Sequence, residues 1–220
     1  RSVPASLRLM HFEKEGDKLQ RGLRGARSTK WWVVTAVALT PLLATPAFGW
    51  INLLKPDRFE LKTGYGFAYT NNKSRPNNFQ TTHLLPSVVY QLGQPMGRGI
   101  LRGVWQYNPE FVFGAFLHPW HRPLFGFNLI QFRYELLDLK KFAPYAMIGA
   151  GFWHGNVERR ETAHDFNFSL HVGAGTRYKL TEKSSLMAEY RHIHISNAGI
   201  DELNSGLNTH NFFVGYAYDL

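Results

Sequence analysis

The most constraining feature of this sequence is a period-two alternation of side chains that recurs along most of its length. In residues 59–70 the odd positions hold mainly aromatic and aliphatic side chains, while the even positions are polar or small. The same alternation returns in residues 166–178 and again in residues 212–220. Successive side chains of a β-strand point to opposite faces, so this period predicts strands rather than amphipathic helices.

The number and length of these runs narrow the fold further. Five more runs bring the predicted strands to eight; they are residues 81–92, 99–107, 122–136, 141–153 and 184–196. Many of the runs last roughly 10–13 residues, whereas soluble strands average about 5–6 and tilted membrane-spanning strands need about 9–11. We therefore predict an all-β protein, an eight-stranded antiparallel transmembrane β-barrel. A barrel of this size is filled by side chains and makes no pore.

Composition agrees with a β-rich chain and limits its chemistry. Aromatic residues make up 15% of the 220 residues, and there are 20 glycines and no cysteine. Without cysteine there is neither a disulfide framework nor a thiolate metal site, which is compatible with an oxidising compartment. The histidines show no metal-ligand spacing. We expect no metal, no other cofactor and no nucleic-acid partner.

The first 49 residues differ from the rest of the chain. An apolar run, residues 31–43, follows the basic cluster Arg21, Arg24, Arg27 and Lys30. The small residues Ala47 and Gly49 fit the −3 and −1 positions of a cleavage site. This pattern predicts a secretory signal peptide over residues 1–49 and a barrel over residues 50–220.

An N-terminal transmembrane anchor is the alternative interpretation of this segment. Pro41 and Pro46, which lie near the end of the apolar run, disfavour a continuous helix there. Met10 as the true start would give a leader of more usual length.

The spacing between the predicted strands gives the barrel an orientation. With both ends of the barrel in the periplasm, the loops after odd-numbered strands are extracellular, and these are residues 71–80, about 108–121, 154–165 and 197–208. The opposite connections are short: residues 93–98, 137–140 and 179–183. Long extracellular loops and short periplasmic turns are typical of outer-membrane barrels. The protein is therefore expected in the outer membrane of a Gram-negative bacterium.

A candidate site lies at the end of the predicted strand 184–196. Glu189 and Arg191 can pair inside a barrel but would be costly against lipid, so His194 and Ser196, of opposite parity, face outward. A histidine two residues before a serine on the same strand face can act as its base, and the turn Asn197-Ala198-Gly199 offers N–H donors for an oxyanion. The substrate of such a site must be a membrane amphiphile.

This site lacks an obvious third member, and it has a non-catalytic alternative. Four residues of the following loop are candidates to orient the histidine: Asp201, Glu202, Asn204 and Asn208. Polar side chains near the rim of a barrel are often only interface anchors, which is the role we expect for His192.

The run from His194 to Gly199, followed by Asn204-Ser205-Gly206 and a short terminal strand, resembles the lipid A 3-O-deacylase family. The resemblance covers the length and eight-strand layout of the mature chain, while its specific motif is confined to about residues 191–208. It implies that His194 is the base and Ser196 the nucleophile in hydrolysis of the 3-O-linked acyl ester of lipid A. It also implies oxyanion-hole or loop-shaping roles for Asn197, Gly199 and Asn204.

One departure from that family concerns the third member of the triad. The family has a glutamate twelve residues after the serine, and this chain has Asn208 there. An amide carbonyl can accept the histidine N–H, but it cannot stabilise the imidazolium as a carboxylate does. The same spacing with asparagine is similar to the triad of outer-membrane phospholipase A, whose barrel is larger. Asn208 is therefore the predicted third member.

Three functions follow as expectations. The first is an outer-membrane serine esterase that deacylates lipid A, with lipopolysaccharide of the outer leaflet as its partner. The second is the same chemistry on phospholipid acyl chains, and the third is a catalytically silent structural barrel. The sequence leaves a homodimer open.

Overall fold

The structure, a computed structural model, describes residues 55–68, 79–118, 121–137, 139–155, 165–200 and 206–220. All of them belong to one compact unit, Phe48–Leu220. The predicted leader over residues 1–49 lies outside the described residues. Within the described ranges, no helix is both long and apolar enough to cross a membrane.

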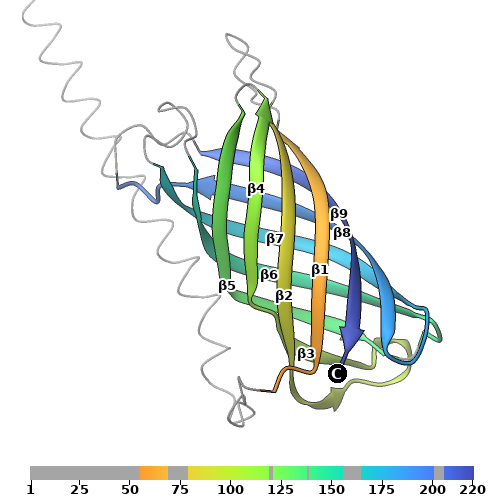
Figure 1. Cartoon of the computed structure of the whole chain (residues 1–220). Coiled ribbons are helices and arrows are strands. Elements are labelled where there is room, and N and C mark those ends of the chain that lie inside the picture. Colours follow the sequence, from red (N-terminus) through yellow and green to blue (C-terminus); the bar gives the residue numbers. More distant parts are fainter. Residues whose placement is uncertain (1–54, 69–78, 119–120, 138, 156–164, 201–205) are drawn as a thin grey trace, which may run out of the picture. The chain divides into compact units, whose positions relative to one another are not determined.

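The described chain forms a closed antiparallel β-barrel (Figure 1). Its strands are β1 (Arg58–Ala68), β2 (Phe79–Met96), β3 (Gly103–Tyr107), β4 (Glu110–His118), β5 (Arg122–Leu136), β6 (Phe142–His154), β7 (Phe166–Lys179), β8 (Ser184–Ser196) and β9 (Leu207–Asp219). β1 pairs with both β2 and β9, which closes the ring. β3 and β4 each pair with β2 and β5, so together they occupy one strand position. The predicted eight-stranded barrel is confirmed.

The third strand position differs from the sequence-based expectation. The strand expected over residues 99–107 is confirmed only over Gly103–Tyr107, because Gly99–Leu101 is a short 3-10 turn. The loop expected over residues 108–121 was wrong, because β4 lies inside it. Asn108 and Pro109 separate β3 from β4. Proline has no N–H to donate to the sheet, so pairing is interrupted at Pro109. The chain nevertheless continues between β2 and β5. Most of the expected second extracellular loop is therefore strand.

Both ends of the chain segment that forms the barrel lie at the same end of the ring. The Leu220 N–H donates to the Asp57 carbonyl at 3.0 Å, which ties the C-terminus to the residue before β1. Figure 1 shows the C-terminus at the lower end of the barrel. We call the opposite end, where β8 finishes and β9 begins, the distal end. β9 starts at Leu207, so the expected loop 197–208 is shorter and Asn208 is a strand residue.

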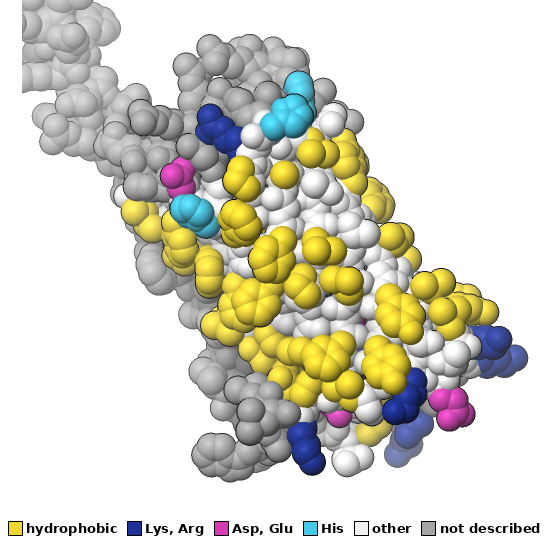
Figure 2. All heavy atoms as spheres, in the orientation of Figure 1, with side chains coloured by type: hydrophobic (Ala, Val, Ile, Leu, Met, Phe, Trp, Pro, Cys, Tyr) yellow, Lys and Arg dark blue, Asp and Glu magenta, His cyan; other side chains and the backbone are white. Residues whose placement is uncertain are grey.

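The two faces of the barrel wall follow the alternation of the sequence. Outward positions carry exposed apolar side chains on every part of the ring, for example Phe59, Phe111, Ile148, Val172 and Val214. Figure 2 shows this apolar surface spread over the outer wall, with Lys and Arg gathered mainly toward the lower end. An exposed apolar band of this kind is what a lipid-facing wall requires.

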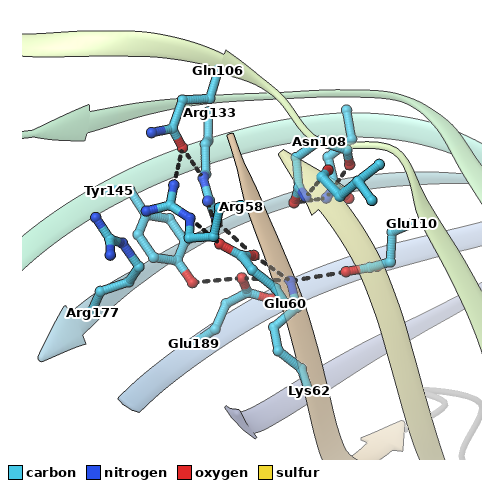
Figure 3. A network of polar contacts seen from close by, with 12 residues as sticks. Arg58, Glu60, Lys62, Gln106, Asn108, Glu110, Arg133, Tyr145, Arg177 and Glu189 are labelled. Carbon is cyan, nitrogen blue, oxygen red and sulfur yellow. Dashed lines mark hydrogen bonds and ion pairs between the residues drawn. The ribbon is translucent and has the colours of Figure 1, made fainter. Parts of the chain in front are cut away.

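The interior of the barrel holds a dense network of charged and amide side chains (Figure 3). Among the described residues, five basic side chains (Arg58, Lys62, Arg133, Arg177 and Arg191) meet five acidic ones (Glu60, Glu110, Glu135, Glu189 and Asp219). Arg133 reaches both carboxylate oxygens of Glu60. Toward the distal end the filling becomes apolar, with Phe79, Phe116, Leu124, Ile195 and Leu207 in one cluster. The charges pair with one another, so the lumen is filled without isolated buried ions.

Candidate active site

The outward face of β8 carries the predicted catalytic pair. Glu189 and Arg191 are buried in the lumen and pair with each other, as the sequence predicts. Because side chains alternate, His194 and Ser196 lie on the outer face, and both are half-buried. β8 runs toward the distal end, so Ser196 is its last residue and lies at the rim.

His194 meets Asn208 across the β8–β9 pair. The two residues are direct partners in the antiparallel register, and His194 Nδ1 lies 2.9 Å from Asn208 Oδ1. An amide oxygen can only accept, so Nδ1 carries the proton and donates it to this bond. In a neutral imidazole the other nitrogen, Nε2, is then the proton acceptor. The contact thus selects the tautomer that a general base needs.

Ser196 lies on the same outward face of β8, two residues nearer the rim than His194. It lies opposite Phe168 of β7, whose aromatic ring is exposed on the outer wall. The described contacts do not include a hydrogen bond between Ser196 and the His194 ring. Catalytic hydrogen bonds in enzymes without substrate are often long and tighten only in the reacting complex.

The chain turns sharply after Ser196. The Ile200 N–H donates to the Asn197 carbonyl at 3.1 Å, and Ala198 and Gly199 have φ values of 55° and 83°. The Gly199 N–H donates to Asn197 Oδ1 at 2.9 Å. Asn197 is fully buried, so its amide holds the turn from the inner side. Asn197 and Gly199 therefore shape the turn. Asn204, the third residue expected to act here, lies outside the described residues.

Gly206 lies close to the His194 ring, and no role for it was expected from the sequence. Its φ is 70°, and a Cβ built on it would lie 2.8 Å from His194 Cε1 and 3.4 Å from Nε2. Only a residue without a side chain leaves the ring where Asn208 holds it. The signal in the sequence was only a glycine two residues before the predicted third member, in a segment expected to be a loop.

A row of aromatic and polar side chains continues from His194 toward the middle of the barrel wall. His192 is the direct partner of His210, and their ring centroids are 5.1 Å apart. The Tyr190 hydroxyl and His210 Nδ1 are 2.7 Å apart. Among the described residues, no group of three or more His, Asp or Glu is arranged to hold a metal ion.

The family model for lipid A 3-O-deacylase (PagL) matches residues 104–217, just over half of the chain, and includes His194, Ser196 and Asn208. A search of curated proteins finds no match. The crystal structure of the outer membrane enzyme PagL is similar over 70% of this chain and 97% of that one, with 16% identity and a TM-score of 0.52.

Two further outer-membrane structures are less similar. Neisserial surface protein A covers 74% of this chain and 97% of its own, with 13% identity and a TM-score of 0.47. OprG from Pseudomonas aeruginosa covers 76% of this chain and 97% of its own, with 12% identity and a TM-score of 0.40. On the strength of the family match and the barrel, this chain is an outer-membrane protein that belongs to the lipid A 3-O-deacylase (PagL) family.

Proposed function

We propose that this protein hydrolyses the 3-O-linked acyl ester of lipid A, with Ser196 as nucleophile, His194 as general base and Asn208 as the residue that orients the base. The observation that carries the proposal is the 2.9 Å contact between His194 Nδ1 and Asn208 Oδ1 on the outward face of β8 and β9. Membership of a family of lipid A deacylases supports the substrate.

The proposed reaction follows the two-step course of serine esterases. Ser196 Oγ attacks the acyl carbonyl carbon while His194 Nε2 takes the hydroxyl proton. The tetrahedral intermediate collapses, and the sugar 3-oxygen leaves with the proton from Nε2. Water, deprotonated by the same nitrogen, then hydrolyses the acyl-enzyme and releases the fatty acid.

The amide of Asn208 sets a limit on this chemistry. It fixes the tautomer of His194, but as a neutral group it stabilises the transient imidazolium less than a carboxylate would. We therefore expect Asn208→Glu to preserve or raise activity.

The turn after Ser196 supplies candidate donors for the oxyanion. Asn197, Gly199 and Asn204 are the proposed contributors. Because the Gly199 N–H is donated to Asn197 Oδ1, it can serve the oxyanion only if substrate displaces that bond. The geometry of the free protein supports the turn-shaping role of Asn197 and Gly199.

The position of the site supports a lipid substrate. His194 and Ser196 lie on the outer wall at the distal end, beside the exposed apolar side chains of Phe168 and Leu170 of β7. An ester presented there belongs to a molecule whose acyl chains lie along the apolar wall. In the proposed orientation this molecule is lipid A of lipopolysaccharide in the outer leaflet.

The test is Ser196→Ala, read by mass spectrometry of lipid A and phospholipids from cells that produce each variant. We expect the natural protein to shift lipid A by the mass of one 3-O-acyl chain and Ser196→Ala to abolish the shift. Ser87→Ala, which changes a buried serine of the lumen far from the site, is the control and should stay active.

Two results would contradict the proposal. Equal lipid A profiles with and without Ser196 would support the alternative that the protein is a structural barrel without catalytic activity. A Ser196-dependent loss of phospholipid acyl chains with unchanged lipid A would establish phospholipase activity instead.

A further inference from the structure

Exposed basic side chains gather at the end of the barrel opposite the candidate site, and Figure 2 shows Lys and Arg at this lower end. Two turns at this end hold four exposed lysines, which are Lys140 and Lys141 between β5 and β6, and Lys179 and Lys183 beside the turn from β7 to β8. The acidic residues of the same two segments are Glu182, which is exposed, and Asp138, which lies outside the described residues. Four lysines against two acidic residues leave a local excess of positive charge.

Three of these lysines, Lys140, Lys141 and Lys179, line a cleft of about 180 Å³. Arg177 adds a fourth cation to the lining, but its guanidinium belongs to the charge network of the lumen. Among the described residues that line the cleft, Asp219 is the one acidic side chain, and it lies 3.7 Å from Arg177. The ion pairs of the described residues include none from the three lysines. Because ammonium groups around one cleft repel each other, a bound anion would stabilise them.

The turn that carries Lys140 has a backbone conformation that lysine adopts rarely. The Phe142 N–H donates to the Leu139 carbonyl at 3.0 Å, so Lys140 and Lys141 are the two central residues of a tight hairpin turn. Lys140 has a φ of 57°, a value at which glycine or asparagine is the usual turn residue. Strained positions of this kind cluster at functional sites. A lysine here is therefore evidence that its side chain has a use.

The outer side of the cleft has the features of a membrane interface. Lys141 Nζ lies 6.0 Å from the centre of the Tyr178 ring. Phe142, which also lines the cleft, is 52% exposed on the outer wall, and its ring centroid is 5.1 Å from that of Tyr178. Tyrosine rings are enriched where the hydrocarbon of a membrane meets the headgroups. The cleft thus adjoins both the apolar wall and the charged rim, as the acyl chains and the phosphate of one lipid require.

We propose that Lys140, Lys141 and Lys179 form a binding site for the phosphate group of an anionic phospholipid, whose acyl chains lie along the apolar wall beside Phe142. Basic pockets at the membrane surface of transmembrane proteins bind anionic head groups in this way. In the proposed orientation of the barrel, this lipid belongs to the periplasmic leaflet, opposite the leaflet that holds the candidate active site. The lipid site does not depend on the reaction proposed for Ser196.

Native mass spectrometry of the full barrel tests the site. The protein is released from detergent micelles that contain either phosphatidylglycerol or phosphatidylcholine, and the retained lipid is counted at each lipid concentration. We expect the natural protein to retain one phosphatidylglycerol molecule in preference to phosphatidylcholine. Lys140→Gln, Lys141→Gln and Lys179→Gln should each lower the affinity for phosphatidylglycerol roughly fivefold, and the triple variant should lose the preference.

A second triple variant, Lys55→Gln/Arg98→Gln/Lys183→Gln, is the matched control for net charge. It removes three exposed basic side chains from the same end of the barrel, and none of the three lines the cleft. It should still retain phosphatidylglycerol. An equal loss in both triple variants would show a general attraction between a basic surface and an anionic lipid, and would overturn the proposal.

Lys140→Gly separates the role of the ammonium group from that of the turn. Glycine suits the φ of 57°, so this variant should keep or raise the urea midpoint of the barrel in phosphatidylcholine vesicles while its affinity for phosphatidylglycerol falls roughly fivefold. Full retention of the lipid by Lys140→Gly would contradict the proposal.

Inorganic phosphate distinguishes a lipid site from a site for a free anion. Added to the natural protein at millimolar concentration, it should not displace phosphatidylglycerol, because it lacks the acyl chains that lie on the wall. Displacement of the lipid by inorganic phosphate would assign the cleft to a free anion and refute the lipid site.

Discussion

At the scale of single residues, the site depends on what surrounds the His194 ring. Asn208 accepts from Nδ1, and Gly206 leaves room beside Cε1 and Nε2. These two neighbours restrict the positions that the ring can take. Small shifts of this ring matter because a misplacement of about 1 Å in a catalytic group can cost about a hundredfold in rate.

Gly206→Ala tests the packing against the ring. The new methyl group would lie 2.8 Å from His194 Cε1, and the φ of 70° is strained for alanine. We expect kcat to fall at least about tenfold while the barrel still forms, because the ring must move away from Asn208. The release of fatty acid from lipopolysaccharide by the purified variant measures this effect.

Gly93→Ala separates backbone strain from the clash. Gly93 has a φ of 79°, and a Cβ there has nothing within 4 Å. It lies in β2 near the end of the barrel opposite the site. If both variants lose the same activity, the loss comes from strain in the barrel and not from the ring of His194.

At the scale of elements, the sheet has one local irregularity at Asn108 and Pro109, which separate β3 from β4. Asn108 compensates for the missing proline N–H with its own side chain, since its Nδ2 donates to the Val88 carbonyl at 2.9 Å. Gln131 Nε2 donates to both the carbonyl and Oδ1 of Asn108, at 2.9 and 2.7 Å. These bonds keep β3 and β4 in one strand position between β2 and β5.

Asn108→Ala should therefore destabilise the barrel. It leaves the Val88 carbonyl without the side-chain donor and Gln131 without one acceptor, which costs about 1–3 kcal/mol of unfolding free energy. Urea unfolding of the barrel in lipid vesicles, followed by tryptophan fluorescence, measures the change in midpoint. Pro109→Ala, which keeps every Asn108 hydrogen bond, should shift the midpoint much less, and an equal shift would refute the bridging role of Asn108.

At the scale of the whole molecule, the closed wall separates an apolar outer face from a charged lumen. The outer face carries exposed apolar side chains, and the lumen holds a network in which the charges of the described residues balance. Lys62 shows the connectivity, because its Nζ reaches Glu110 at 2.8 Å and Glu189 at 3.3 Å. The network links β1, β4 and β8, so it ties together strands that are not neighbours in the sheet.

Arg133→Met removes one charge from this network and should destabilise it. Arg133 is fully buried and binds both oxygens of Glu60, which would keep only its contacts with Arg58 and Lys62. Breaking a buried pair from one side costs about 3–5 kcal/mol. We expect the lower end of that range, because Glu60 retains other partners, and denaturant unfolding in vesicles measures it.

The double variant Arg133→Met/Glu60→Gln restores the balance of charge and is the control for lost packing. It should recover part of the stability that Arg133→Met loses. A double variant less stable than the single one would show that charge balance is not what the network contributes.

The sequence alone determined which side of the wall each residue occupies. Side-chain direction alternates with a fixed period of two, so a charged pair such as Glu189 and Arg191 assigns the lumen face and places His194 and Ser196 outside. The same local pattern correctly predicted an eight-stranded barrel. It failed at β4, which lies within the residues expected to form the loop 108–121.

Only the tertiary structure decided which residues lie opposite the proposed catalytic pair. Asn208 was expected in a loop, and it became the partner of His194 because β9 begins at Leu207 in a register set by the whole β8–β9 ladder. The closeness of Gly206 to the ring, and the row from His192 through His210 to Tyr190, depend on the same register. Register arises from pairing between segments that a local period cannot align, and so it comes only with the closed barrel.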